Sequence, residues 1–424
     1  MNISLGSFSH CKARQLLVVF AAASVGLPIA WISLAKVLVV LVGLGYLTAN
    51  VLTGKTDVPL FESNTTKAIA VAILAFFVSL LWTQVSMDIA LLATVKHAKL
   101  LVIPMLILLI RTREDARIGL YAFAAVQTFV LLSSFLLAFN VPVPWVTDPI
   151  GNFVVFSTYL DQSIMMSATA AVLWHLRDKG IWPFWFAAVA SSAALVDAVF
   201  LLDGRTGYAV AITIVTLTVV WALPKRLRLA AVVLTPTLAL LILFVSSNHI
   251  KSRLSEILQG GAEFSQHVQS KEGSEWQPAT SSSGWRLNAW HRSVQSMQER
   301  PWYGHGVGSW AVAVKRIEGA KAEEVFGVGN ASNPHQEYLL WGVELGILGS
   351  ILYIAILLAM ARDAKSFKLA TQKAVWSVLA ALAVASLFNS VLYDDLIGDF
   401  FCVTLGLLMA LGFREAQEQE KAIE

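Results

Sequence analysis

The composition of this chain excludes a water-soluble fold. Of its 424 residues, 57% are hydrophobic and only 14% are charged, and the mean hydropathy is +0.67, whereas soluble domains have roughly 45 to 50% apolar and about 25% charged residues. The net charge of +3 is too small to indicate a nucleic-acid partner. Cys11 and Cys402 lie nearly a chain length apart and predict no disulfide framework. We therefore expect one all-α, polytopic membrane protein.

Twelve segments are predicted to span the membrane, because each offers close to the roughly 20 apolar residues needed to cross about 30 Å of hydrocarbon. The first two are separated only near Lys36, and the last carries Asp399 near its start. A cleaved signal peptide is the alternative for the first segment, since Lys12 and Arg14 precede it, but its apolar run continues through Trp31. The expected spans cover residues 15–34, 36–53, 67–86, 90–110, 117–139, 159–176, 181–202, 206–223, 229–246, 336–361, 373–390 and 396–413.

The basic residues predict the orientation of these spans, because Lys and Arg gather in short cytoplasmic loops. The predicted loops alternate between the two sides of the membrane, and those on one side hold most of the basic residues. On the other side, the short connections hold only Lys36 and Arg205. Both termini are therefore expected in the cytoplasm, and the segment from 247 to 335 outside. The basic residues assigned to the cytoplasmic side are Lys12, Arg14, Lys55, Lys67, Arg111, Arg113, Arg117, Arg177, Lys179, Lys225, Arg226, Arg228, Arg362, Lys365, Lys368, Lys373, Arg414 and Lys421.

The chain is expected to have four parts: spans one to nine (1–246), a long outer loop (247–335), spans ten to twelve (336–413) and a cytoplasmic tail (414–424). Loops of this length are usually functional or disordered. Residues 249–259 predict an amphipathic helix, and a second helix is expected from near Ser283 to Pro301, followed by a glycine-rich turn, WYGHGVGSW. Asn333 and Pro334 are expected to begin the tenth span, as its N-cap and first helical residue.

Three side chains suited to anion binding and proton transfer are expected on this outer face: Arg205, Arg286 and His335. The planar guanidinium groups match phosphate oxygens, and a helix N-terminus adds backbone NH groups and partial positive charge. Together they predict an anionic site to which a pyrophosphate is suited. Each residue also has a purely structural interpretation: Arg205 paired with Asp203, Arg286 on a solvated helix face, and His335 as a buried structural histidine. As a functional residue, His335 has the chemistry of a general base near neutral pH.

Three motifs in this order resemble the O-antigen ligase and polymerase superfamily: GRTGY (204–208), SGWRLNAWHRSVQSMQERPWYGHGVGSW (283–310) and NPHQEYLLWGVELGILG (333–349). The resemblance covers roughly residues 204–350 and implies a bacterial inner-membrane enzyme with its active site on the periplasmic face. The implied reaction is metal-independent transfer of polysaccharide from undecaprenyl diphosphate to a sugar hydroxyl of lipid A-core, with inversion. By this analogy Arg205 and Arg286 hold the diphosphate and His335 activates the acceptor hydroxyl. The family often has Asn after the histidine, where this chain has Gln336.

Two groups of charged residues inside or beside the spans need a separate explanation. Lys96 and Lys99 lie about one helical turn apart in the fourth span, and charges in such helices usually face the bundle interior or a water-filled cavity. We expect one or both to extend the positive surface toward the diphosphate; the alternative is snorkelling to the outer headgroups. Asp394, Asp395 and Asp399 are the candidates for a metal cluster, but capping or the orientation of an arginine is the favoured interpretation.

The aromatic residues of the outer segment are candidates for sugar stacking, although membrane-interface or packing roles are more common for such residues. Tyr208 lies about a turn beyond Arg205, and Tyr208, Gln336 and Trp285 are taken as possible substrate contacts. The loop tryptophans are Trp276, Trp285, Trp290, Trp302 and Trp310.

Two other functions fit parts of the sequence. An O-antigen polymerase uses the same donor and similar arginines, but extends a second lipid-linked chain. A transporter predicts a substrate site at the membrane midplane and often two related halves, whereas the candidate residues here gather at one face. The sequence thus favours a ligase without cofactor, whose partners are the lipid-linked donor, lipid A-core and membrane lipids.

Overall fold

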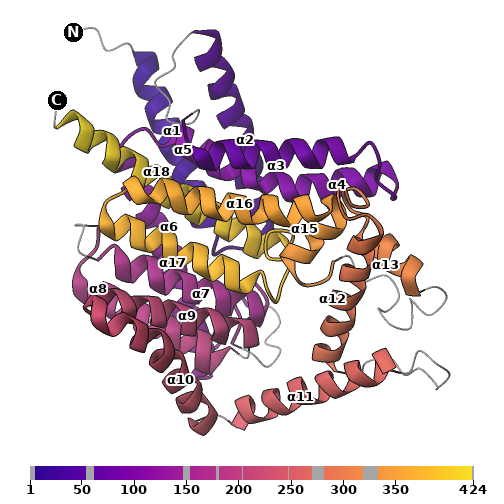
Figure 1. Ribbon diagram of the computed structural model, residues 1–424. Coiled ribbons are helices and arrows are strands. Elements are labelled where there is room, and N and C mark those ends of the chain that lie inside the picture. The colour runs from indigo at the N-terminus through magenta and orange to yellow at the C-terminus, as the bar shows by residue number, and fades with distance from the viewer. Residues whose placement is uncertain are drawn as a thin grey trace.

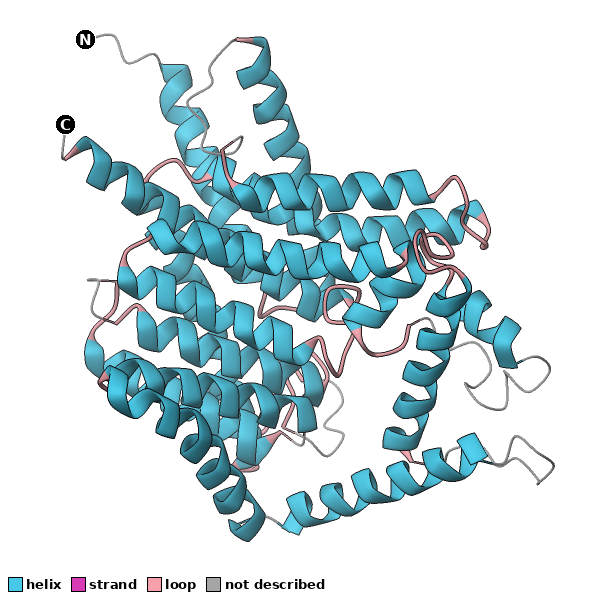
Figure 2. Ribbon diagram, viewed as in Figure 1, coloured by secondary structure: helices cyan, strands magenta, loops and turns pink. Residues whose placement is uncertain are grey.

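The computed structural model describes residues 5–53, 62–146, 153–177, 181–202, 204–246, 248–269, 281–318 and 333–422. Within these ranges the chain forms helices and contains no β-strand (Figure 2). The helices of the first half are α1 (Leu5–Ser24), α2 (Ile29–Leu52), α3 (Asn64–Ser79), α4 (Met87–Ala98), α5 (Val102–Leu109), α6 (Arg113–Ala138), α7 (Tyr159–His175), α8 (Phe184–Val196), α9 (Arg205–Ala222) and α10 (Arg228–Ser246). The second half has α11 (Asn248–Gln269), α12 (Ser282–Glu299), α13 (Trp310–Glu318), α15 (Glu337–Leu345), α16 (Ile347–Asp363), α17 (Leu369–Ala385) and α18 (Asp395–Lys421).

The apolar helices form a bundle of membrane-spanning length. Among the described residues, seven helices are long and apolar enough to cross a membrane: Ile29–Leu52, Met87–Leu109, Arg113–Ala138, Phe184–Leu201, Arg205–Ala222, Ile347–Ser366 and Asp395–Lys421. Two shorter apolar helices are Asn64–Ser79 and Leu369–Ala385. The chain is thus an all-helical membrane protein, although length and composition alone do not reproduce the expected count of twelve spans.

Helix α18 forms the centre of the bundle. Its apolar window is 89% buried, whereas that of α2 is only 22% buried. Within the bundle α18 packs against α5, α6 and α17, and α5 also packs against α2. A span that is apolar on all sides and enclosed by other helices contributes mostly to the core, whereas α2 leaves most of its apolar surface on the outside.

The boundary expected between the first two spans is wrong. The chain breaks at residues 25–28, and Pro28 precedes α2 with an extended backbone (φ −52°, ψ 148°). Proline restricts the residue before it away from helical geometry, so α1 ends earlier than its apolar run suggests. Lys36 consequently lies inside α2 rather than in a connection, and its Nζ contacts Asp399 Oδ2 of α18 at 2.7 Å.

The expected tenth span is also divided, and it begins later than predicted. Helix α15 starts at Glu337 with Gln336 as its N-cap, not at Asn333 and Pro334. It ends at Gly346, whose backbone (φ 72°, ψ −168°) is accessible to glycine but strained for other residues. Only α16, beyond this break, has the length and composition of a membrane span.

The long segment between α10 and α15 carries the two expected helices. In Figure 1, α11 extends from the end of α10 at the lower edge of the molecule toward α12, which rises to α15. Ser281 caps α12 through its side chain, close to the start expected near Ser283. Gly304, Gly306 and Gly308 all have positive φ, so the sequence from 302 to 310 is the turn that its glycines predict.

Candidate active site

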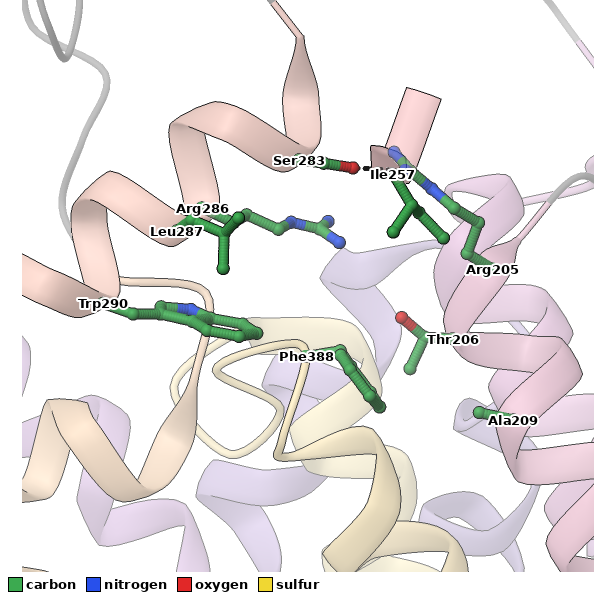
Figure 3. Close-up of a pocket in the computed structure, with 9 residues that line it drawn as sticks. All are labelled: Arg205, Thr206, Ala209, Ile257, Ser283, Arg286, Leu287, Trp290 and Phe388. Carbon is green, nitrogen blue, oxygen red and sulfur yellow. Dashed lines mark hydrogen bonds between the residues drawn. The ribbon is translucent and has the colours of Figure 1, made fainter. Parts of the chain in front are cut away.

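Arg205 and Arg286 line one cavity, each from near the N-terminal end of its helix (Figure 3). The cavity has a volume of about 310 Å³. Arg205 is the first residue of α9, and Arg286 projects from α12 toward it. Thr206 and Ser283 add hydroxyl groups, and the remaining walls are apolar or aromatic: Ala209, Ile257, Leu287, Trp290 and Phe388. The cavity therefore combines a cationic region with a largely apolar lining, as an amphiphilic anion requires.

Glycines bring the arginine-bearing end of α9 close to α7. A Cβ atom at Gly204 or Gly207 would collide with the side chain of Ser163 on α7, so close packing at this point depends on the missing side chains. The GRTGY motif thereby places Arg205 directly at the helix junction. This is a packing reason for the two glycines that flank Arg205.

The two guanidinium groups of the cavity repel one another. Burial lowers the pKa of Arg286, and the charge of Arg205 lowers it further. A bound anion would relieve this repulsion by neutralising both groups. The electrostatics of the cavity therefore favour a ligand that carries more than one negative charge.

Arg205 also has partners from the segment between α10 and α15. Its Nη1 donates to Ser283 Oγ at 2.7 Å, and its Nη2 lies 3.6 Å from Glu256 Oε2 of α11. Asp203, the partner considered from the sequence, lies outside the described residues. Among the described residues Glu256 supplies a carboxylate to Arg205, and α11 closes one side of the cavity through Ile257.

His335 lies immediately before α15 rather than in its first turn, with a left-handed backbone (φ 49°). Asn333 Oδ1 accepts a hydrogen bond from His335 N at 2.8 Å, so an asparagine turn stabilises this conformation. The imidazole packs against Trp285 of α12, with ring centroids 5.3 Å apart. Its Nδ1 is buried and has no hydrogen-bond partner in the described part of the chain.

The surroundings of His335 keep its imidazole neutral. Burial lowers its pKa to about 4, and Arg286 contributes as the second cause. His335 is thus coupled electrostatically to the cavity that contains Arg286, and its ring is in the unprotonated form at neutral pH. This form can accept a proton from a hydroxyl group.

Gln336 has a structural role at the start of α15. Its side-chain oxygen accepts from Leu339 N at 2.6 Å, and its own N donates to Ser390 Oγ at 3.1 Å. Asparagine caps helices more often than glutamine, so the glutamine found where the family often has asparagine still performs capping. Its amide oxygen is therefore already engaged by the backbone.

The structure places Lys96 and Lys99 against the connection between α17 and α18. Lys99 is 1% exposed, and its Nζ donates to the carbonyl oxygen of Asp394 at 2.7 Å and lies 3.5 Å from Asp395 Oδ1. Snorkelling of Lys99 to the headgroups is therefore wrong. Lys96 lies over the ring of Tyr393, 4.3 Å from its centroid. Neither lysine lines the cavity of the two arginines.

Two of the three aspartates of this region approach lysines with their carboxylates, and Asp394 contacts Lys99 through its carbonyl oxygen. Asp395 lies near Lys99, and Asp399 contacts Lys36. Among the described residues, no group of three or more histidine, cysteine, aspartate or glutamate side chains is arranged to hold a metal ion. The carboxylates of Asp395 and Asp399 thus compensate the ammonium groups of Lys99 and Lys36 inside the bundle.

The loop tryptophans have different environments. Trp285 contacts His335, and Trp290 lines the cavity while its Nε1 donates to Pro334 O at 3.1 Å. Trp302 is 66% exposed, whereas Trp310 is buried and donates to Ser293 Oγ. Trp276 lies outside the described residues. Tyr208 is half-buried on α9 and is not one of the cavity-lining residues.

Several residues of the site have no motif that would reveal them. Phe388 and Ile257 enter the cavity from two distant segments, and Glu256 reaches Arg205 only because α11 packs against α12. For α11 the amphipathic pattern of residues 249–259 predicted a helix, but not its contact with Arg205.

Comparison with known proteins finds a family match for the central part of the chain. No curated protein matches it. Residues 186–354, from α8 to α16, match the family model described as O-antigen ligase, a family of membrane glycosyltransferases of the ligase and polymerase type. The matched segment contains Arg205, Arg286 and His335 and confirms the resemblance carried by the three motifs. Residues 186–354 are thus similar to the O-antigen ligase family, in agreement with the resemblance to the ligase and polymerase superfamily.

Proposed function

We propose that this protein is an O-antigen ligase of the bacterial inner membrane. It transfers O-antigen polysaccharide from undecaprenyl diphosphate to a sugar hydroxyl of lipid A-core, with the site on the periplasmic face. The topology that goes with this function has twelve spans, both termini in the cytoplasm, and residues 247–335 outside. The family match and the apolar helices support the class of enzyme and its membrane location.

The observation that carries the proposal is the convergence of Arg205 and Arg286 in one largely apolar cavity. Two guanidinium groups can bind a diphosphate through paired hydrogen bonds, and the apolar walls suit the adjoining lipid. A diphosphate leaves the anomeric carbon readily, so the protein mainly has to bind its charge and orient the attacking oxygen. No metal ion is needed for either task.

His335 acts as the general base in this mechanism. The neutral imidazole accepts the proton of the acceptor hydroxyl while the oxygen attacks the anomeric carbon from the side opposite the diphosphate. The carbon–oxygen bond to the diphosphate breaks as the new glycosidic bond forms, which inverts the anomeric centre. Trp285 holds the imidazole by ring contact, and Tyr208 and Gln336 are proposed to contact substrate. Lys96 and Lys99, which pack against the connection between α17 and α18, are proposed to add positive potential to the site.

The test uses purified protein, polysaccharide-loaded undecaprenyl diphosphate and lipid A-core, with EDTA present. A ladder on lipid A-core with the wild type, and its loss with His335→Ala, is the expected result. Growth of the undecaprenyl-linked chain with unmodified lipid A-core would assign a polymerase instead. Transport of a small solute by proteoliposomes, without a covalent lipid product, would replace both enzymes by a transporter.

A further inference from the structure

Glu337 is a fully buried carboxylate two residues after His335 and has no part in the mechanism above. Its Oε1 accepts from Trp341 Nε1 at 2.8 Å, and its Oε2 accepts from Leu392 N at 2.9 Å and from Tyr393 N at 3.4 Å. A carboxylate can accept through both oxygens, so it binds its own helix and a distant segment together. A buried acceptor with this many donors restrains both segments.

The distant segment is the connection of residues 386–394 between α17 and α18, here called the α17–α18 loop. The backbone of the residues after His335 binds it as well: Gln336 N donates to Ser390 Oγ at 3.1 Å, and Glu337 N donates to Ser386 O at 3.0 Å. Tyr353 OH and Ser386 Oγ are a further 2.7 Å apart. The segment that carries His335 is therefore fastened to the loop by both main chain and side chain.

The same loop forms a wall of the cavity that Arg205 and Arg286 line. Phe388 lines the cavity, and its ring lies 6.5 Å from that of Trp290 on α12. One short loop thus connects the base-bearing segment to the cavity of the two arginines. A displacement of this loop therefore alters the position of His335 relative to the bound diphosphate.

We propose that Glu337 is a positioning residue for the transfer reaction, which keeps His335 in register with the Arg205–Arg286 cavity by holding the α17–α18 loop. This inference rests on the proposed function. Glutamine at this position retains the size of the side chain but replaces one acceptor oxygen by an NH₂ group. Either Trp341 or the two loop amides then face a donor instead of an acceptor.

The experiment compares Glu337→Gln with Trp341→Phe in the lipid A-core ligation assay. Trp341→Phe is the matched control, because it removes the donor to Oε1 and leaves the loop bonds. For Glu337→Gln we expect kcat to fall about tenfold or more with the donor KM within about twofold, since small displacements of reacting groups reduce rates strongly. For Trp341→Phe we expect kcat within about threefold of the wild type.

The role of His335 in this effect is tested by combining Glu337→Gln with His335→Ala. If Glu337 acts through His335, adding Glu337→Gln to His335→Ala leaves the residual rate of His335→Ala unchanged, because the effects of coupled residues are not additive. Equal losses in both backgrounds, or a raised donor KM with unchanged kcat, overturn the positioning role. Should Glu337→Gln not elute as a folded protein, Ser390→Ala, which removes the acceptor of Gln336 N, is read in the same two backgrounds. A wild type without transfer overturns the proposed function and this inference with it, whereas additive losses in an active enzyme overturn the inference alone.

Discussion

The coupling between Arg286 and His335 predicts a specific pH dependence. The pKa of His335 is lowered from 6.5 to about 4, by burial first and by Arg286 second. In the free enzyme, the acid limb of kcat/KM is therefore expected near pH 4, where the base becomes protonated. Replacing Arg286 by Gln removes the second cause, so the pKa of His335 rises and the limb moves to higher pH.

The size of this shift follows from the order of the two causes. Because burial is the larger, Arg286 accounts for less than half of the difference between 6.5 and about 4. The limb is thus expected to move upward by at most about 1 unit, which corresponds to about 1.4 kcal/mol of interaction between the two charged groups. Burial remains in the variant, so the limb stays below 6.5.

A bound diphosphate should act in the same direction as the substitution. Its negative charge offsets Arg286, so the acid limb of kcat, which reports the donor complex, is expected at higher pH than that of kcat/KM. Initial ligation rates from about pH 4 to pH 8 measure both limbs. Arg300→Gln is the control, since it removes one positive charge outside the cavity. A limb that does not move in Arg286→Gln, or that moves equally in Arg300→Gln, would refute the electrostatic coupling.

Four further predictions follow from contacts of the described residues. The lowered pKa of His335 means that the unfolded chain binds more protons between pH 6.5 and about 4, so the free energy of unfolding should fall as the pH decreases through this window, with a smaller fall in His335→Phe when chemical denaturation is compared. Glu256→Gln should lower the donor KM about two- to fivefold, because a partly exposed pair with Arg205 worth about 0.5 to 1 kcal/mol no longer competes with the diphosphate; Glu263→Gln, which removes the same charge from α11, should not, and an equal effect would indicate a general change of potential. Gly346→Ala should destabilise the protein by about 3 kcal/mol or more in thermal unfolding, because its Cβ would lie 2.5 Å from the carbonyl carbon of Trp302 at a positive φ, whereas Gly261→Ala, with open space around its Cβ, should not destabilise. Lys36→Met should cost about 3 to 5 kcal/mol by leaving Asp399 as an uncompensated buried charge, and Lys36→Met combined with Asp399→Asn should recover part of it; a single variant as stable as the wild type would contradict the pairing.

The helices of the bundle are predictable from sequence because apolar runs of sufficient length have few other solutions in a membrane. The boundaries of these helices depend on single residues whose effect on the backbone a hydropathy average does not detect. Pro28 ends the first helix before its apolar run is complete, and Gly346 divides a run that is apolar on both sides. The sequence predicted Asn333 as the N-cap of α15, but the N-cap is Gln336, three residues later.

The candidate site shows the same division between local and distant information. The arginines and His335 are recognisable because their chemistry is unusual for their surroundings and their motifs are ordered along the chain. Glu337 and Phe388 are not, since a glutamate in a first helical turn and a phenylalanine in a short connection are ordinary residues. Their roles arise from the contact of α15 with the α17–α18 loop, about 50 residues away, which requires the folded chain.

The ion pair of Lys36 with Asp399 has a consequence for the biosynthesis of the chain. The two residues are 363 positions apart, so α2 enters the membrane long before its counter-charge in α18 has been translated. Lys99 is in the same situation, because Asp395 also belongs to α18. An ammonium group inside an apolar helix is costly in lipid until it is neutralised. The last helix thus completes the charge balance of helices made near the beginning, and a chain interrupted before Asp395 leaves Lys36 and Lys99 without these carboxylates.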